Sequence, residues 1–188
     1  MFRSTGFSLS STTLLLVAVI LVGGSTNVRA IVPRTILAPY SESLFEIQQY
    51  AETLFLNESR SITIKANEPY NFTHIKIKVG ETYRFTVGSP GWNNGSWETD
   101  AGGYNEGSQA FANVPPRHPD FNLMALTAEI FTVDGSRTSY SGAYFLIGLG
   151  PKTWKATRTG YLVAFANDCL QCYGDNSRVV TLTIKRTA

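Results

Sequence analysis

The sequence predicts an all-β protein, an antiparallel β-sandwich or jelly roll of about eight strands with one helix before it. Three observations indicate this fold class. From residue 61 onward apolar and polar residues alternate with the period of a strand, and glycine, proline and asparagine separate the alternating runs. Helical spacing occurs over residues 43–56. We therefore expect one small domain built around a single core.

The first 30 residues have the pattern of a secretory signal peptide. An apolar run at residues 14–22 follows Arg3, is too short to span a bilayer, and leads to Val28-Arg29-Ala30. We expect cleavage after Ala30 and a secreted product; a retained signal anchor is the alternative. Cleavage would remove two of the 16 basic residues and none of the 14 acidic ones, which leaves no net charge. The mature chain thus gives no electrostatic reason to bind nucleic acid or anionic membranes, and no second apolar run predicts its insertion into a bilayer.

Residues 31–59 are expected to form a helical extension, followed by the sandwich at residues 60–188. Ser43 and Glu46 have capping-box spacing, and apolar residues then recur at helical intervals up to about Leu56. This apolar stripe is expected to pack against the sheet or against a second copy of the chain, so the protein could form a homo-oligomer.

The sandwich is predicted from runs of strand length. Residues 79–81 are expected to be a tight turn that joins the second and third strands. The connection at residues 92–120 is rich in Gly, Asn, Ser and Pro, which is typical of a functional or mobile loop. The predicted strands are residues 61–65, 75–79, 82–87, 124–131, 143–147, 153–157, 161–166 and 179–184.

The loop at residues 167–176, between the last two strands, concentrates oxygen-bearing side chains. Asp168, Asp175 and Asn176 supply two carboxylates and an amide, which are the hard oxygen ligands that Ca²⁺ prefers. The same residue types are common in turns, so a polar turn that caps a hairpin is the alternative.

Both cysteines, Cys169 and Cys172, lie in this loop. In an oxidising compartment the pair most simply forms a disulfide with itself. A thioredoxin-like redox motif would need a helix after the second cysteine, and a zinc site would need more ligands than the scattered His74 and His118.

A second polar segment, residues 91–95, can reach the same end of a sandwich. A cation held by the loop at 167–176 would keep positions filled by water, which the paired hydroxyls of a sugar can replace. Trp92 or Trp97 would then offer a stacking wall for the apolar face of the sugar. The alternative for Trp92 is a plug in the core.

No hydrolytic or transfer motif is present in the sequence: there is no G-x-S-x-G, no H-E-x-x-H and no glycine-rich phosphate loop. We therefore expect a binding protein rather than an enzyme. Three N-x-S/T sequons make Asn57, Asn71 and Asn94 candidate glycosylation sites.

Over about residues 60–186 the chain resembles the PA-IL/LecA-type galactophilic lectin domain. The most specific match is N-D-x4-Y-G-[ND]-N-S, which is Asn167-Asp168 followed by Tyr173-Gly174-Asp175-Asn176-Ser177 here. The Gly91-Trp92 pair and the strand pattern around it add matches of moderate specificity.

The resemblance implies a small β-sandwich that binds Ca²⁺ and, through it, galactose or a related sugar. It makes Asp168, Asp175 and Asn176 side-chain ligands of the ion, and it makes the backbone carbonyl of Cys172 a further ligand. Asp168 and Asp175 would also contact the sugar hydroxyls.

The sequence departs from the family pattern at several positions. A tyrosine that gives the metal a backbone carbonyl in the family falls near Gly95. His118 and Asp120 match a sugar-contacting His-Pro-Asp loop, although a long insertion precedes them, and Arg178 stands where a glycine is usual.

The sequence thus predicts a secreted, calcium-dependent module that recognises galactose-type sugars on glycans or glycoconjugates. The rival hypothesis is an extracellular structural or adhesive β-sandwich that keeps the fold and does not bind sugar.

Overall fold

The computed structural model describes residues 49–88, 91–104, 115–134 and 137–188, all within one compact unit, Arg34–Ala188. These residues form two antiparallel sheets, with one short 3₁₀ helix, η3 (Tyr173–Asp175), so the all-β prediction is confirmed. The predicted signal peptide and residues 43–48 of the predicted helix lie outside the described residues. The strands are β1 (Ser59–Lys65), β2 (Asn71–Ile77), β3 (Thr82–Gly88), β4 (Trp92–Asn94), β5 (Trp97–Thr99), β6 (Leu126–Asp134), β7 (Arg137–Leu146), β8 (Lys152–Lys155), β9 (Gly160–Ala166) and β10 (Asn176–Arg186).

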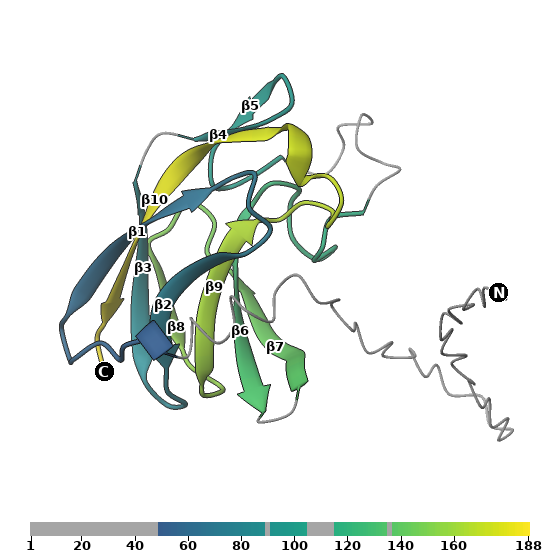
Figure 1. The fold of residues 1–188 in the computed structure, drawn as a ribbon. Coiled ribbons are helices and arrows are strands. Elements are labelled where there is room, and N and C mark those ends of the chain that lie inside the picture. Colours follow the sequence, from purple (N-terminus) through teal and green to yellow (C-terminus); the bar gives the residue numbers. More distant parts are fainter. Residues whose placement is uncertain (1–48, 89–90, 105–114, 135–136) are drawn as a thin grey trace, which may run out of the picture. The chain divides into compact units, whose positions relative to one another are not determined.

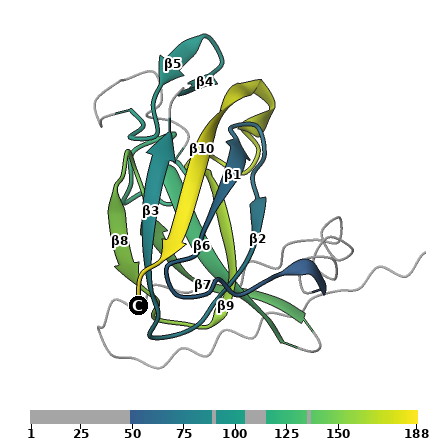
Figure 2. The same ribbon diagram turned by 90° about the vertical axis from the view of Figure 1, so that its left-hand side faces the viewer.

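The long strand β10 organises the six-stranded sheet. It pairs with β1 along one side, from Lys185 to Val179, and with β3 along the other. Beyond β3, β4 continues along β10 with Trp92 opposite Arg178, and β5 pairs with β4. Figure 2 shows β3, β10 and β1 facing the viewer, with β4 and β5 above them. The first three residues of β10 are thereby held beside the β4–β5 hairpin.

The second sheet has the order β2-β9-β6-β7 and packs against the first (Figure 1). Its central strand β9 is buried on both faces, which explains its continuous apolar sequence. Leu162 and Ala164 face the core between the sheets, whereas Val163 and Phe165 belong to a second apolar cluster with Tyr70 and Phe131. Polar residues that follow β9 therefore start from a rigid, fully packed strand.

The core between the sheets is made by alternate residues of the strands. Phe85 of β3, Ile64 of β1 and Leu182 of β10 are completely buried against Leu126 and Ile130 of β6. Removing one such side chain from water contributes about 1.5–3 kcal/mol, so this layer fixes the register of the strands that carry the loops.

The predicted tight turn at residues 79–81 is present and is one of the connections that cross between the sheets. Residues 79–81 join β2 to β3, but β2 pairs with β9, whereas β3 pairs with β10 and β8. The loop between β9 and β10 also leads from one sheet to the other. A polar turn that caps a hairpin is therefore wrong for residues 167–175, because these residues bridge the two layers.

The predicted helix does not extend over residues 51–56. Gln49 and Tyr50 are helical, but Glu52 forms a parallel bridge with Ile75 of β2. The register of β2 shifts at a bulge, where His74 has a φ of 54°. At this bulge the Glu52 backbone N–H donates to the His74 carbonyl at 3.0 Å, and the Lys76 backbone N–H donates to the Glu52 carbonyl at 2.8 Å. Pairing with the sheet edge thus replaces the last helical turns.

Within the described residues, no helix has the length and apolarity needed to cross a membrane.

Candidate functional site

The loop between β9 and β10 places a buried carboxylate beside a buried amide. Asp168 is 2% exposed; its Oδ1 accepts a hydrogen bond from the Cys169 backbone N–H at 2.7 Å. Its Oδ2 accepts one from Nδ2 of Asn176, at the start of β10, at 2.9 Å. Among the described residues no lysine or arginine forms an ion pair with Asp168. An ionised carboxylate can accept about four hydrogen bonds, so this group keeps acceptor capacity inside the protein.

Asn176 has an acceptor without a partner. The residue is 5% exposed, and its Nδ2 donates both to Asp168 and to the Ala66 backbone carbonyl at 3.3 Å. Its Oδ1 is buried and has no hydrogen-bond partner within the part of the chain that the structure describes. A buried acceptor left unmatched costs about 1–3 kcal/mol, so this oxygen has the capacity to accept a hydrogen bond or to coordinate a cation.

Asp175 and Gly95 lie next to this pair. The Gly95 backbone N–H donates to the Asp175 carbonyl at 3.1 Å, and Gly95 has a φ of 56°, which favours glycine. A Cβ at this position would come within 3.3 Å of the Asp175 carboxylate. The glycine therefore allows the β4–β5 turn to approach the acidic loop closely.

The electrostatics of Asp168 reflect this crowding. Burial raises the pKa of the Asp168 carboxyl above its ordinary value, the hydrogen bonds from Asn176 and Cys169 lower it, and the negative charge of Asp175 raises it. A nearby cation would favour the ionised form of Asp168 and offset the repulsion from Asp175.

The predicted disulfide between Cys169 and Cys172 is confirmed. Their Cα atoms are 5.1 Å apart, and the Cys172 backbone N–H donates to the Cys169 carbonyl at 3.0 Å. The two sulfurs lie near the Asp168 carboxylate, within a cluster that spans 4.8 Å. Soft metals bind thiolates, and neither sulfur is a thiolate here, so the donor set left to a metal consists of oxygen atoms.

The segment at residues 117–122 is bound to the same loop. The Asn167 side chain accepts from the His118 backbone N–H at 2.9 Å and donates to the His118 carbonyl at 2.9 Å. It also donates to the carbonyls of Phe121 and Asn122 at 3.1 Å each. In addition, the Arg117 backbone N–H donates to the Asp168 carbonyl at 3.1 Å. The segment that contains His118 and Asp120 is thus held against the loop.

A buried ion pair holds Arg117, the first residue of this segment. Arg117 and Glu129 of β6 are 2.6 Å apart, with side chains 4% and 8% exposed. The guanidinium also lies over the rings of Tyr70 and Phe165, at 4.3 and 4.0 Å from their centroids. Sequence reasoning missed Asn167, Arg117 and Glu129 as site-building residues. A signal was present for Glu129, because a charge inside an otherwise apolar strand needs a buried partner.

Beside this segment, aromatic rings form a stack that reaches the surface. His118 stacks on Tyr144 of β7, with ring centroids 4.0 Å apart and planes 17° apart. The Tyr144 hydroxyl lies 3.4 Å from Oδ2 of Asp120, which is exposed. Sequence reasoning did not select Tyr144, whose position on a strand gives no sign of its partner on another loop.

Trp92 does not offer a stacking wall. Its side chain is 0% exposed in the core, and its Nε1 donates to the Met124 backbone carbonyl at 3.0 Å. The alternative of a core plug is the correct one, because Trp92 belongs to the apolar cluster between the sheets. Trp97 of β5 is exposed.

The three sequons differ in accessibility. Asn57 is exposed in a turn, with a φ of 66°. Asn71 is buried and its side chain bonds to the backbone of Lys65 and Glu68, and Asn94 is buried in β4 opposite Asn176. In the folded chain only Asn57, of these three, presents its side chain to solvent.

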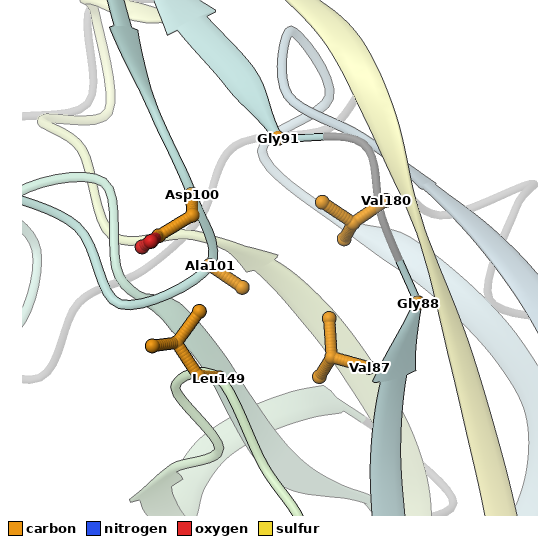
Figure 3. Close-up of a pocket in the computed structure, with 7 residues that line it drawn as sticks. All are labelled: Val87, Gly88, Gly91, Asp100, Ala101, Leu149 and Val180. Carbon is orange, nitrogen blue, oxygen red and sulfur yellow. The ribbon is translucent and has the colours of Figure 1, made fainter.

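A separate apolar cleft of about 220 Å³ lies near the start of the β4–β5 hairpin (Figure 3). In Figure 3 the side chains of Val87, Val180 and Leu149 point toward one another, whereas the Asp100 carboxylate points away from them. The Asp100 oxygen Oδ1 instead accepts from the Gly102 backbone N–H at 2.8 Å. Ligand pockets usually reach about 300–1,000 Å³ and contain convergent polar groups, so this cleft is the weaker candidate. It is lined by Val87, Gly88, Gly91, Asp100, Ala101, Leu149 and Val180.

No family model and no curated protein matches the chain. Among solved structures, one similar chain is described as "EclA N-terminal domain; PllA-like lectin". It is 21% identical, with a TM-score of 0.41, and the match covers 67% of this chain and 94% of that one. Function therefore has to be inferred from the chain's own residues.

Proposed function

We propose that this protein is a carbohydrate-binding module that holds Ca²⁺ in the loop between β9 and β10 and uses it to recognise galactose-type sugars. The side chains of Asp168, Asp175 and Asn176 would hold the ion, together with the backbone carbonyls of Cys172 and Gly95. The proposed activity is binding without catalysis, by a secreted protein.

The observation that carries the proposal is the unpaired Oδ1 of Asn176 beside the buried carboxylate of Asp168. Each of these groups is costly to bury alone, and both are hard oxygen donors. One divalent cation would satisfy the amide oxygen and neutralise the carboxylate at the same time. Because Asp175 adds a second negative charge nearby, a hard dication fits this donor set better than a neutral or anionic ligand.

The bound ion would supply open coordination positions that two neighbouring sugar hydroxyls can fill. The chain's own residues would orient the sugar: Asp168 and Asp175 accept hydrogen bonds from hydroxyls, and the loop with His118 and Asp120 forms the adjacent wall. Asn167 fixes that wall through four hydrogen bonds. A neutral ligand also suits a mature chain that is expected to have no net charge.

The first experiment measures thermal unfolding with Ca²⁺ and with a chelator. At about 100 times the dissociation constant, Ca²⁺ should stabilise the native protein by about 2.7 kcal/mol, which corresponds to roughly 5–10 °C in Tm. Asp168→Ala should abolish this shift. Asp100→Ala is the matched control. Asp100 lies at the apolar cleft and not in the loop between β9 and β10, so this variant should keep the shift.

The second experiment measures glycan-array binding by the native protein in Ca²⁺, with Asp168→Ala as the negative control. Signals on galactose-terminated glycans that disappear in the variant would support the proposal. A native protein whose Tm ignores Ca²⁺ would contradict the cation site. A calcium shift without any glycan signal would favour a structural or adhesive domain.

A further inference from the structure

We propose that Tyr144 forms a second sugar subsite next to the loop between β9 and β10, called the cation loop below, so that the protein binds a galactose-terminated disaccharide more tightly than the monosaccharide. This inference rests on the proposed function and extends it from one sugar ring to two.

The first observation is an aromatic ring that is both ordered and accessible. Tyr144 is 44% exposed, although His118 stacks on it at 4.0 Å and Phe121 packs against it in a T-shaped arrangement at 5.8 Å. These contacts fix the plane of the ring before a ligand arrives. Binding to a ring that is already immobilised loses little side-chain entropy.

The second observation is a carboxylate at the edge of the same ring. The Tyr144 hydroxyl donates to Oδ2 of Asp120 at 3.4 Å, and Asp120 is exposed. A pyranose presents C–H groups on one face and hydroxyls around its rim. The ring of Tyr144 matches the C–H face, and the Asp120 carboxylate can accept a hydrogen bond from a rim hydroxyl. An apolar face bordered by an acceptor thus fits a sugar better than a purely apolar ligand.

The third observation is the position of this subsite relative to the cation loop. Tyr144 contacts His118, both backbone polar groups of His118 are bonded to the Asn167 side chain, and Asn167 precedes Asp168 in the chain. A sugar that gives hydroxyls to an ion at Asp168 would already occupy the loop. The ring of Tyr144 stacks on His118, whose segment is bonded to this loop, so an adjoining sugar that extends over the segment would meet the ring.

The test compares a monosaccharide with disaccharides on the full-length mature protein by isothermal titration calorimetry in saturating Ca²⁺. The ligands are methyl galactoside and a set of galactose-terminated disaccharides that differ in linkage. The native protein should bind at least one disaccharide more tightly. Tyr144→Leu should reduce that advantage by about three- to ten-fold, the range expected for one aromatic contact.

Three further variants make the result specific. Tyr144→Phe keeps the ring and should retain most of the disaccharide advantage. Phe55→Ala removes an exposed aromatic side chain next to β1, at the opposite end of β10 from the cation loop, and should change neither affinity. Trp97→Ala tests the exposed tryptophan of β5 as the competing platform. Each variant should keep the native calcium-induced shift in Tm, which shows that it is folded.

The outcomes separate this inference from the proposed function. Equal affinities of the native protein for mono- and disaccharides, or an advantage that survives Tyr144→Leu, would overturn the second subsite alone. Loss of the advantage in Trp97→Ala instead of Tyr144→Leu would do the same. If the native protein binds no sugar, both the proposed function and the second subsite are wrong.

Discussion

Glu129 and Asp168 are both buried acids, and the partners of their carboxylates differ. Glu129 has a cation of its own: the guanidinium of Arg117 lies 2.6 Å away and is enclosed by the rings of Tyr70 and Phe165. Asp168 has two hydrogen-bond donors, an amide and a backbone N–H, and no ion pair among the described residues. The first arrangement is complete without a ligand, whereas the second leaves negative charge and an unmatched amide oxygen.

Arg117 contacts both acids, one through its side chain and the other through its backbone. Its side chain is used on Glu129, while its backbone N–H donates to the Asp168 carbonyl at 3.1 Å. The chain therefore brings an arginine to the loop between β9 and β10 without giving its charge to that loop. Removing the Arg117 guanidinium should therefore damage the fold. Removing Ca²⁺ should reduce binding and stability but leave the fold intact.

Breaking the internal pair should give the largest effect. Arg117→Met leaves Glu129 buried without its counter-charge, so the free energy of unfolding should fall by about 3–5 kcal/mol, in Ca²⁺ and in chelator alike. Urea unfolding under both conditions measures this. The double variant Arg117→Met, Glu129→Leu is the control, because removing both charges should recover most of the loss. A double variant as unstable as the single one would show that the charge is not the cause.

Much of the fold could be predicted because its strands show their period. The alternation in β1, β3 and β10 is plain in the sequence, and so is the continuous apolar run of β9. Strands β4 and β5 were missed because three residues are too few to show a period. The tight turn at residues 79–81 was predicted, but its crossing between sheets was not, because a glycine turn has the same sequence whether it joins paired strands or crosses between sheets.

The candidate site was predictable where its residues are close in sequence. Asp168, the disulfide and Asn176 lie within one loop, so their types and spacing indicated a shared role. The stacking role suggested for Trp92 was wrong because the core neighbours that bury this side chain, such as Met124, are far away in the chain. The roles of Asn167 and Tyr144 depend on contacts with residues 117–122, which local patterns do not contain.

A change at Asp168, the acid without an ion pair among the described residues, should give a smaller effect that depends on Ca²⁺. Asp168→Asn keeps the size of the side chain and removes its negative charge, along with the repulsion from Asp175. In chelator the variant should be at least as stable as the native protein, because burying a charge is costly. In Ca²⁺ it should lack the stabilisation of about 2.7 kcal/mol expected for the native protein at 100 times the dissociation constant. Thermal unfolding at several Ca²⁺ concentrations measures both. A variant that is less stable than native by the same amount in both conditions would contradict the comparison, since Asp168 would then act like Glu129.

The smallest expected effect concerns backbone strain at Arg178, close to the loop between β9 and β10. Arg178 follows Asn176 and Ser177 in β10, has a φ of 70° and forms an exposed ion pair with Glu98 at 2.6 Å. Glycine adopts this conformation without strain, so Arg178→Gly should stabilise the protein by about 0.5–1 kcal/mol. The lost ion pair contributes little because it is exposed, and Glu98→Gln measures that contribution separately. Because no charge near Asp168 is paired with Arg178, the gain should be equal in Ca²⁺ and in chelator. A gain confined to Ca²⁺ would mean that the backbone at Arg178, and not only the charge at Asp168, sets the affinity for the ion.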